Sequence, residues 1–383
     1  MRICLVYDCL FPYTVGGAER WYRNLGERLA AEGHDVTYIT MRQWDRSHKP
    51  DIPGVCVKAV GPRMALYTAS GRRRILPPIV YGAGVLAHLG LRGRYDVVHT
   101  ASFPYFSLLA AGLVRPFRRF RLLVDWHELW TLRYWREYLG RLGGTLGWLV
   151  QYACVKLPQR AFCFSQLHVE RLRGEGVHGD VTVLPGEYAG STARPQPEPA
   201  EQVLVFAGRQ IPEKRVPALV PMMQRLRERH ADLRLEIYGD GPERGRLLEQ
   251  IAAAGVGDVI TAHGFVDGAE VSAAMRRALC HVLHSRREGY GMVVIEAASV
   301  GTPSVVARDP DNAAVELVED GVNGVIAESA EPEALAAAVE RVIAAGSGLR
   351  DSTADWFGRN APERSLDRSL AIVVEGYTGE LQQ

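Results

Sequence analysis

Residues 285–307 have the sequence SRREGYGMVVIEAASVGTPSVVA. They begin with the last residue of the apolar segment CHVLHS (280–285), a predicted strand, and they end in PSVVA (303–307), a second predicted strand. Between the two strands, residues 292–300 have the pattern of a helix. A strand, a helix and a strand in this order are typical of a parallel sheet that is covered by helices.

The same alternation continues on both sides of this stretch, with helical patterns between most of the strands. A segment rich in proline and polar residues, GSTARPQPEPAEQ (190–202), interrupts the pattern and is the best linker candidate. We therefore expect an α/β protein of two Rossmann-like, doubly wound domains that face a cleft at the carboxyl ends of their strands. The predicted strands are 1–7, 34–40, 96–101, 121–127, 160–165 and 181–185 before the linker, and 202–209, 233–242, 259–266, 280–285, 303–307 and 324–328 after it.

The domain boundaries follow from this pattern. We expect a first domain over residues 1–190 and a second over 200–362. The helical segment at about 363–383 is expected to pack back on the first domain. A chain of 383 residues is long enough for two hydrophobic cores.

The charge is distributed unevenly along the chain. Up to Gly190 there are 25 Lys and Arg against 15 Asp and Glu, whereas the remainder has 20 against 29. A basic first half suggests an anionic partner, such as a membrane surface or a phosphorylated acceptor, and a solvated basic face is the alternative. No motif supports binding of nucleic acid.

The cysteines and the apolar segments indicate where in the cell the protein is expected. The six cysteines form no Cys-x-x-Cys pair, so we expect reduced core residues and no metal site. The chain starts with a predicted strand and not with a signal peptide, and prolines and glycines interrupt the uncharged run 75–91. We therefore expect a cytoplasmic protein without a transmembrane segment.

Two loops contain candidates for binding phosphate. Gly16 and Gly17 directly precede a predicted helix, whose free N–H groups favour anions. Arg209, Lys214 and Arg215 follow the end of a predicted strand, where cations can neutralise a diphosphate. The alternatives are a plain turn and a solvated basic loop. The segment IYGDGPERG has the wrong glycine spacing for a dinucleotide site, which argues against a nicotinamide dehydrogenase.

Glu288 and Glu296 lie on either side of the predicted helix start. Carboxylates accept pairs of hydroxyl hydrogen bonds, and the N–H groups of Gly291 and Met292 can hold a phosphate. A nucleotide sugar has hydroxyls at both ends and a diphosphate between them, so it matches this layout.

The stretch with Glu288-x7-Glu296 closely resembles the signature of the retaining glycosyltransferases of family 4, which have the GT-B fold. Further segments resemble the family in the right order and extend the similarity over nearly the whole chain. These segments are GGAERWYRNLGERLAAEGHDVTYIT (16–40), FAGRQIPEKRV (206–216), YGDGPERGRL (238–247), HGFV (263–266) and ELVEDGVNGVIAE (316–328).

The resemblance implies a role for each matching residue. Arg209 and Lys214 hold the donor diphosphate, Glu288 the sugar hydroxyls and Glu296 the ribose. His127, in LVDWHE, faces the reacting sugar from the first domain; without the resemblance, a packed histidine at a strand end is favoured. The implied catalytic residues are His127, Arg209, Lys214 and Glu288, and the implied donor contacts are Gly16, Gly17, Arg209, Lys214, Phe265, Glu288, Gly289, Tyr290, Gly291, Met292, Val293 and Glu296.

The chain departs from the family pattern in two places. Lys214-Arg215 replaces the common Lys-Gly, which changes the loop geometry and leaves the lysine in place. The segment ARDPDNAAVELV (307–318) replaces a glycine-glycine form, so Asp311, Asn312 and Glu316 are expected to contact the donor or acceptor differently.

The implied activity is transfer of a hexose from a UDP- or GDP-sugar to an acceptor hydroxyl, with retention of configuration and without a metal ion or cofactor. No covalent nucleophile is assigned. The first domain, which is expected to choose the acceptor, carries basic clusters close to apolar segments. These suit a lipid-linked or cell-envelope acceptor and peripheral contact with an anionic membrane at its inner face, and a natural-product acceptor is the rival. The clusters are Arg72, Arg73 and Arg74, and Arg115, Arg118, Arg119 and Arg121.

Two other classes of protein remain open. A nucleotide-sugar epimerase of the same fold would convert the donor without an acceptor. A non-catalytic sugar-binding protein would bind the donor and never release free nucleotide.

Overall fold

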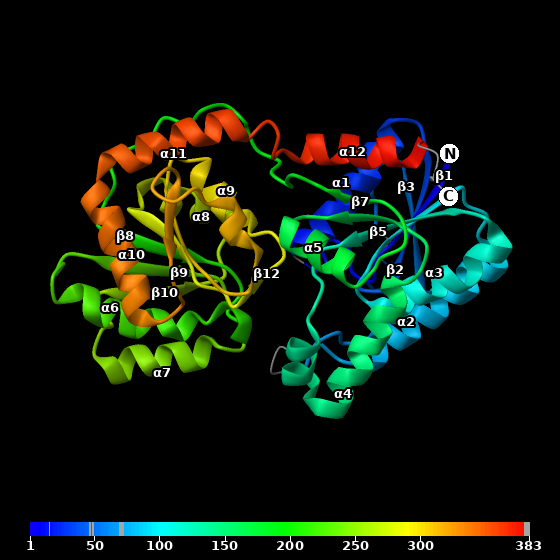
Figure 1. Cartoon of the computed structure of the whole chain (residues 1–383), viewed down its shortest axis with the longest axis horizontal. Coiled ribbons are helices and arrows are strands. Elements are labelled where there is room, and N and C mark those ends of the chain that lie inside the picture. The colour runs from blue at the N-terminus through cyan, green and yellow to red at the C-terminus, as the bar shows by residue number, and fades with distance from the viewer. Residues whose placement is uncertain (15, 46, 48–49, 69–72, 379–383) are drawn as a thin grey trace. The chain divides into compact units, whose positions relative to one another are not determined.

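The computed structural model describes residues 1–14, 16–45, 47, 50–68 and 73–378, so Arg72 and residues 379–383 lie outside it. The described chain forms two compact units, shown in Figure 1. The first unit takes its residues from 1–68, 73–185 and 369–378, and the second consists of 186–368. Each unit is built around its own parallel sheet.

The first unit has a sheet of seven strands in the order β3-β2-β1-β4-β5-β6-β7. Its central strands are buried almost throughout, which explains why they appear in the sequence as continuous apolar runs. In register, Cys4 of β1 lies opposite Thr37 of β2 and Val98 of β4. The strands are β1 (Arg2–Val6), β2 (Asp35–Met41), β3 (Val55–Gly61), β4 (Val97–Ala101), β5 (Arg121–Trp126), β6 (Arg160–Cys163) and β7 (Val181–Val183).

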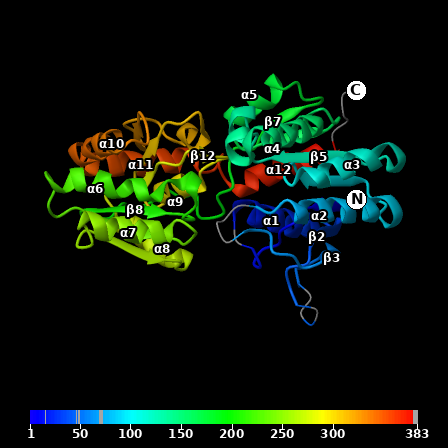
Figure 2. The same ribbon diagram turned by 90° about the horizontal axis from the view of Figure 1, so that it is seen from below.

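Helices cover both faces of this sheet. Figures 1 and 2 show α2, α3 and α4 on one side and α12 on the other. Pro77 and Pro78 lie in the first turn of α2, where proline is tolerated because those N–H groups have no helical partner. The helices are α1 (Gly17–Ala31), α2 (Leu76–Ala87), the π-helical turn η1 (His88–Arg92), α3 (Tyr105–Arg118), α4 (Leu132–Val155), α5 (Gln166–Gly174) and α12 (Leu366–Thr378).

The second unit has a sheet of six strands in the order β10-β9-β8-β11-β13-β15. A separate pair of short strands, β12 (Arg287–Glu288) and β14 (Asp311–Asn312), runs parallel and places Glu288 opposite Asn312. The strands of the main sheet are β8 (Val203–Ala207), β9 (Arg234–Tyr238), β10 (Ile260–Gly264), β11 (Cys280–Leu283), β13 (Ser304–Ala307) and β15 (Gly324–Ala327).

The helices of the second unit complete its core, in which Phe206, Ile237 and Val339 are fully buried. The helices are α6 (Leu219–Arg227), α7 (Arg244–Ala254), α8 (Gly268–Arg277), α9 (Met292–Ala298), α10 (Pro332–Ala345) and α11 (Ser347–Asn360), with 3-10 turns η2 (Pro212–Lys214), η3 (Val216–Ala218) and η4 (Ala313–Leu317). Every strand predicted from the sequence is found, and the expected α/β architecture of two doubly wound sheets is confirmed.

Three further findings concern the sequence-based expectations. Strand β3 was not predicted, because it lies at the sheet edge and only one of its seven residues is fully buried. Five of the cysteines are buried thiols as expected, whereas Cys56 of β3 is exposed. Among the described helices, none is both long and apolar enough to cross a membrane.

Candidate functional site

The loop after β8 carries the two predicted diphosphate ligands. Arg209 lies two residues past the end of the strand and is exposed, and Lys214 ends the short turn η2. The backbone of the loop is held in place, since the Gln210 N–H donates to the carbonyl of Asp240 at 2.8 Å. Both cations therefore extend from a backbone that is fixed at the carboxyl end of a buried strand.

Arg215 adopts the left-handed conformation, with φ of 52°. Glycine reaches this conformation freely, and other residues pay a steric cost there. Two contacts offset that cost: the Arg215 guanidinium pairs with Asp309 at 3.0 Å, and its carbonyl accepts a hydrogen bond from His284 Nε2 at 2.8 Å. The backbone at this departure from the family pattern thus still has a conformation that glycine would allow.

Lys214 and Glu288 form an ion pair between Nζ and Oε1, although 74 positions separate them in the sequence. Both side chains are mostly buried, with exposed fractions of 17% and 12%. Two contacts fasten the same segments together: the Arg286 N–H donates to the Glu213 carbonyl at 2.8 Å, and Arg287 lies 3.9 Å from the Glu213 carboxylate. The fold therefore brings the predicted diphosphate ligand and the predicted sugar ligand into direct contact.

Helix α9 begins directly after this pair. Its N-cap, Gly291, has φ of 102°, and a Cβ atom at this position would come within 2.5 Å of the Ala314 Cβ. Only glycine fits such a position without strain. Met292 and Val293 form the first turn and are half-buried, and Glu296 lies one turn further along the helix, also half-buried.

The remaining predicted donor contacts differ in exposure. Gly289 is half-buried beside Glu288, whereas Tyr290 is buried and its burial raises the pKa of the phenol to about 12. Phe265 follows the end of β10 and is 76% exposed, so its ring is available for stacking on a flat ligand.

The side chain of Asn312 hydrogen-bonds the backbone on both sides of its turn. Its amide donates to the Ala307 carbonyl at 2.9 Å, and its oxygen accepts from the Ala314 N–H at 3.1 Å. The side chain therefore shapes the turn between β14 and η4. Of the other two residues singled out in this segment, Asp311 is half-buried and Glu316 is exposed.

Two buried histidines beneath the loop were not singled out from the sequence. His281 lies in β11 and His284 follows it, and burial lowers their pKa values to about 3 and about 4, with the charge of Lys214 acting in the same direction. Both rings are therefore neutral at pH 7, and His284 Nε2 donates to the Arg215 carbonyl. The segment CHVLHS looked like an ordinary strand, and only its packing shows that the ring of His284 holds the loop backbone at Arg215.

The start of α1, in the first unit, holds the predicted Gly16 and Gly17. Gly17 is the first helical residue, and a Cβ atom on Gly16 would overlap with the carboxylate of Glu19. Glu19 is buried in the first turn, where its charge suits the helix dipole. A phosphate bound here would lie near this negative charge, and the phosphate contact of the two glycines stays a prediction.

His127 lies directly after β5. Its ring stacks on Phe164 with a centroid distance of 4.6 Å, and its buried Nε2 atom has no hydrogen-bond partner among the described residues. Burial lowers the pKa of His127, so its imidazole is neutral at pH 7. One face of the ring is thus packed, and a buried polar ring atom is left without a partner among the described residues.

A buried network near His127 was missed from the sequence. Asp125 accepts from Trp21 Nε1 at 2.7 Å and lies 2.8 Å from His99 Nε2, and His99 Nδ1 lies 2.6 Å from the hydroxyl of Tyr377. These residues come from α1, β4, β5 and α12. The network fixes the strand end from which His127 extends, and its members are too far apart in sequence to be recognised together.

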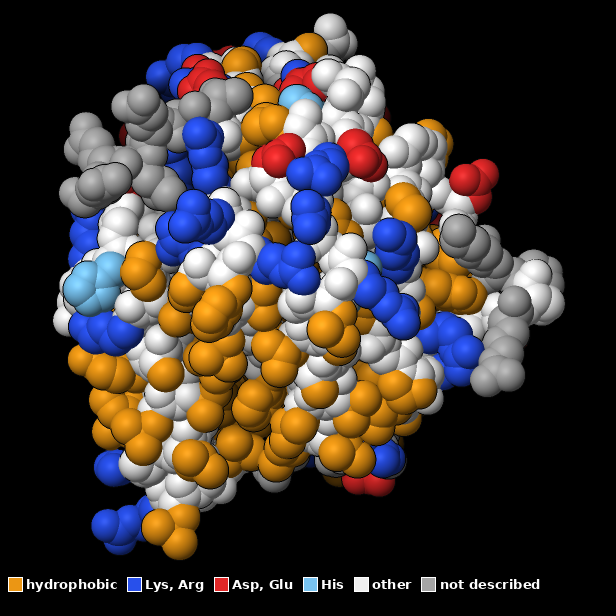
Figure 3. All heavy atoms as spheres, turned by 90° about the vertical axis from the view of Figure 1, so that its right-hand side faces the viewer, with side chains coloured by type: hydrophobic (Ala, Val, Ile, Leu, Met, Phe, Trp, Pro, Cys, Tyr) orange, Lys and Arg blue, Asp and Glu red, His pale blue; other side chains and the backbone are white. Residues whose placement is uncertain are grey.

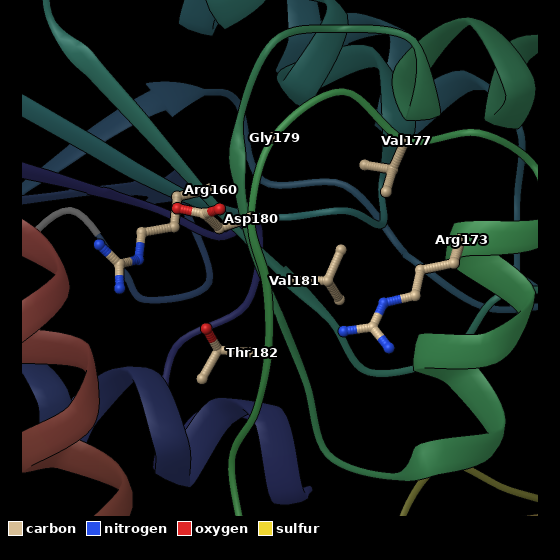
Figure 4. A pocket seen from close by; sticks show the side chains of 7 residues that line it. All are labelled: Arg160, Arg173, Val177, Gly179, Asp180, Val181 and Thr182. Atoms are coloured by element: carbon tan, nitrogen blue, oxygen red, sulfur yellow. The ribbon is translucent and has the colours of Figure 1, made fainter. Parts of the chain in front are cut away.

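A cavity of about 460 Å³ lies elsewhere, at the β7 edge of the first sheet. Figure 4 shows that its two arginines, Arg160 and Arg173, stand on opposite sides of the chain segment with Val181. None of the predicted site residues lines this cavity. Among the described residues, no group of three or more His, Cys, Asp or Glu side chains is arranged to hold a metal ion.

Comparison with known proteins finds two family models. "Glycosyltransferase Family 4" matches residues 15–186, and "Glycosyl transferases group 1" matches residues 192–364. A glycogen synthase of Mycobacterium tuberculosis is 27% identical over 363 residues, which covers 90% of this chain and 86% of that protein.

Solved structures share the fold. Sucrose-phosphate synthase from Thermosynechococcus elongatus has a TM-score of 0.80 and 20% identity, with 98% of each chain covered. Anabaena HepE, solved in complex with UDP-glucose, has a TM-score of 0.72 and 17% identity, with 98% of this chain and 99% of that chain covered. The expected GT-B fold is confirmed by this similarity.

Proposed function

The chain is a glycosyltransferase of family 4 with the GT-B fold, and from this premise we propose that it transfers a hexose from a UDP- or GDP-sugar to an acceptor hydroxyl. We further propose that the reaction retains the anomeric configuration and uses no metal ion. The Lys214–Glu288 ion pair supports this proposal most directly, because it joins the predicted phosphate ligand to the predicted sugar ligand just before the start of α9.

Lys214 and Arg209 are proposed to bind the donor diphosphate. Phosphate oxygens form strong charge-assisted hydrogen bonds with ammonium and guanidinium groups. As the sugar departs, negative charge grows on the leaving diphosphate, and preorganised cations stabilise that charge. These two side chains would supply the neutralisation that a divalent metal ion supplies in other transferases.

Glu288 is proposed to bind hydroxyls of the donor sugar, and Glu296 those of the ribose. The Glu288 carboxylate is already paired with Lys214, so a sugar hydroxyl would donate its hydrogen bond to a carboxylate whose charge is balanced. The exposed ring of Phe265 would lie against the base. The backbone from Gly289 to Val293 would complete the donor contacts.

The proposed chemistry takes place on one face of the sugar. The bond between the anomeric carbon and the diphosphate oxygen breaks, the acceptor oxygen bonds to the same face, and its proton passes to the leaving phosphate. His127, neutral and with Nε2 unpartnered, would accept or donate a hydrogen bond to a hydroxyl of the reacting sugar. No side chain is assigned as a covalent nucleophile.

The donor nucleotide and the acceptor are the finer parts of the proposal. Anabaena HepE was solved with UDP-glucose, which favours UDP as the first nucleotide to test. The acceptor is proposed to be lipid-linked or part of the cell envelope, in keeping with the basic charge of the first half of the chain.

The test is a screen of UDP-, GDP-, ADP- and dTDP-sugars, with and without EDTA, that follows both melting temperature and nucleotide release. One donor should raise the melting temperature and release free nucleotide at the same rate in EDTA. NMR of the product formed with a simple alcohol should show the donor's anomeric configuration.

Each alternative gives a different result in this screen. An epimerase would form a new nucleotide sugar without free nucleotide, and a sugar-binding protein would show the thermal shift alone. Loss of activity in EDTA, restored by a divalent ion, would overturn the metal-independent part of the proposal.

A further inference from the structure

Helix α2 is apolar on all sides, although one side of it is open to solvent, as is Leu91 of the following turn η1. The inner side packs into the unit through buried residues such as Tyr81 and Val85. The outer side exposes Leu76, Ile79 and Leu86, and Leu91 of η1 is 80% exposed. A helix that is apolar on all sides is ordinarily buried on all sides, whereas the outer side of α2 is not covered by any described part of the chain.

Helix α3 extends this apolar surface. It lies against α2, with Gly82 so close that a Cβ atom there would come within 2.6 Å of the Phe106 Cβ. Its outer side exposes Leu113 and Phe117, and Phe117 is 85% exposed. The outer sides of two adjacent helices thus form one apolar surface.

Helix α4 adds a third row of apolar side chains. It contacts α3, and after the kink at Gly140 it exposes Leu142, Leu146 and Leu149, of which Leu142 is 90% exposed. Spacings of four and three residues place these leucines on one side of the helix. We call the whole surface the apolar face; it consists of Leu76, Ile79, Leu86, Leu91, Leu113, Phe117, Leu142, Leu146 and Leu149.

Figure 3 shows hydrophobic side chains covering a broad, continuous area of the first unit, with Lys and Arg side chains gathered along its upper border. The second unit contrasts with this surface. Of the large hydrophobic side chains exposed in the described part of the chain, the second unit contributes Leu248 and Phe265. Contiguous apolar surfaces of this kind mark interaction sites.

The charge of the segment that carries α2 and α3 is almost entirely positive. Residues 52–124, which include α2 and α3, contain eleven Lys and Arg and a single acidic residue, Asp96. The net positive charge of this segment, eleven basic minus one acidic residue, equals the net positive charge of residues 1–190, which have 25 basic and 15 acidic residues. Arg92 and Arg119 are exposed at the ends of η1 and α3, and Arg74 is exposed just before α2.

We propose that the apolar face docks on an anionic lipid bilayer. Its leucines and Phe117 would enter the interface between headgroups and acyl chains, and the bordering arginines would contact lipid phosphates. A second copy of the chain fits less well, because a symmetric contact through this face would bring two arginine borders together. The inference deepens the proposed function by placing the acceptor at a lipid surface. The location of the acceptor rests on the proposed function, whereas the docking of the apolar face does not.

The experiment is flotation of the full chain with phosphatidylcholine vesicles, with and without phosphatidylglycerol, over a salt series. We expect binding to the anionic vesicles that weakens as salt rises. Phe117→Ser combined with Leu142→Ser should weaken binding about tenfold or more, because two large apolar side chains lose their burial. Leu248→Ser, a matched exposed leucine of the second unit, should bind like the wild type.

A second pair of variants tests the charge. Arg92→Ser and Arg119→Ser should each weaken binding to the anionic vesicles about fivefold. Arg359→Ser, an exposed arginine of the second unit, is the control. All variants should hydrolyse the donor in the absence of vesicles at the wild-type rate, so that a failure of membrane binding is distinguishable from a failure of the proposed function.

Several outcomes would overturn the inference. One is a wild type that does not float with any vesicle, and another is flotation of the apolar-face variants at the wild-type level. A wild-type dimer in sedimentation velocity that Phe117→Ser dissociates, without vesicle binding, would assign the apolar face to a second copy of the chain instead.

Discussion

At the scale of single residues, the Lys214–Glu288 ion pair has two separable contributions. It fastens the loop after β8 to strand β12, and it presents a cation and a carboxylate at one point of the second unit. The first contribution depends only on opposite charges, whereas the second depends on which residue carries which charge. Substitutions can therefore distinguish them.

Glu288→Gln preserves the shape of the side chain and removes its charge. An uncharged amide binds sugar hydroxyls more weakly, so we expect kcat/KM for transfer to fall about a hundredfold with little change of fold. Steady-state rates of nucleotide release and circular dichroism measure the two effects. Glu333→Gln, an exposed ion-pair residue of α10, is the matched control. Wild-type turnover in Glu288→Gln would remove this residue from the site.

Exchanging the two charges separates stability from catalysis. Lys214→Glu alone places two carboxylates together and should lower the free energy of unfolding by about 2 kcal/mol. Adding Glu288→Lys should recover most of that loss, while transfer stays abolished because the diphosphate would then meet a carboxylate. Chemical denaturation and donor turnover are the measurements. Recovery of turnover in the double variant would contradict the assigned roles.

At the scale of elements, the entry into α9 depends on a glycine. Gly291→Ala forces a side chain into a left-handed conformation and toward Ala314. We expect a loss of about 1–3 kcal/mol in the free energy of unfolding and weaker donor binding. Gly245→Ala in α7 is the control, since a Cβ there meets no atom within 4 Å, and it should be neutral or slightly stabilising. Equal stability of the two variants would show that the turn adapts.

The elements themselves were predictable to different degrees. Buried strands such as β8 and β11 appear as apolar runs between glycines and polar turns, so their positions followed from the sequence. Strand β3 did not, because an edge strand with mixed exposure lacks a clear pattern. The prolines in the run 75–91 suggested interruption, yet they lie in the first turn of α2, where they favour a helix.

At the scale of the whole molecule, the buried His281 and His284 make stability depend on pH. Their pKa values in the folded chain, about 3 and about 4, lie below the ordinary value of 6.5. Between pH 6.5 and about 4 the unfolded chain binds protons that the folded chain does not, so stability is lost as the pH falls. Each histidine contributes a slope of about 1.4 kcal/mol per pH unit at most.

The measurement is the free energy of unfolding from urea titrations between about pH 7.5 and about pH 4.5. A histidine of the unfolded chain takes up its proton in this range. His284→Gln keeps a donor for the Arg215 carbonyl and should flatten the slope relative to the wild type. His263→Gln, at an exposed histidine of β10, is the control. An unchanged slope in His284→Gln would show that His284 already carries a proton in the folded chain.

The residues of the candidate site were predicted one at a time, and their contacts were not. Arg209, Lys214, Glu288 and Glu296 stood out because they follow strand ends or occupy a recognisable signature. The supporting histidines and the network from Asp125 to Tyr377 did not, because a buried polar side chain looks the same in sequence whether or not a partner exists. The ligand contact expected of Asn312 stays a prediction, and the structure adds that its amide hydrogen-bonds the backbone.

By itself, the sequence determined the fold class, the family and the candidate ligand residues, because hydrophobic periodicity and short motifs are local properties of a chain. Only the tertiary structure decided that Lys214 pairs with Glu288 and that His281 and His284 are neutral. It also decided that the leucines of α2, α3 and α4 face outward together. Burial and ion pairing depend on which distant segments come into contact. Those contacts are determined by the free energy of packing the whole chain.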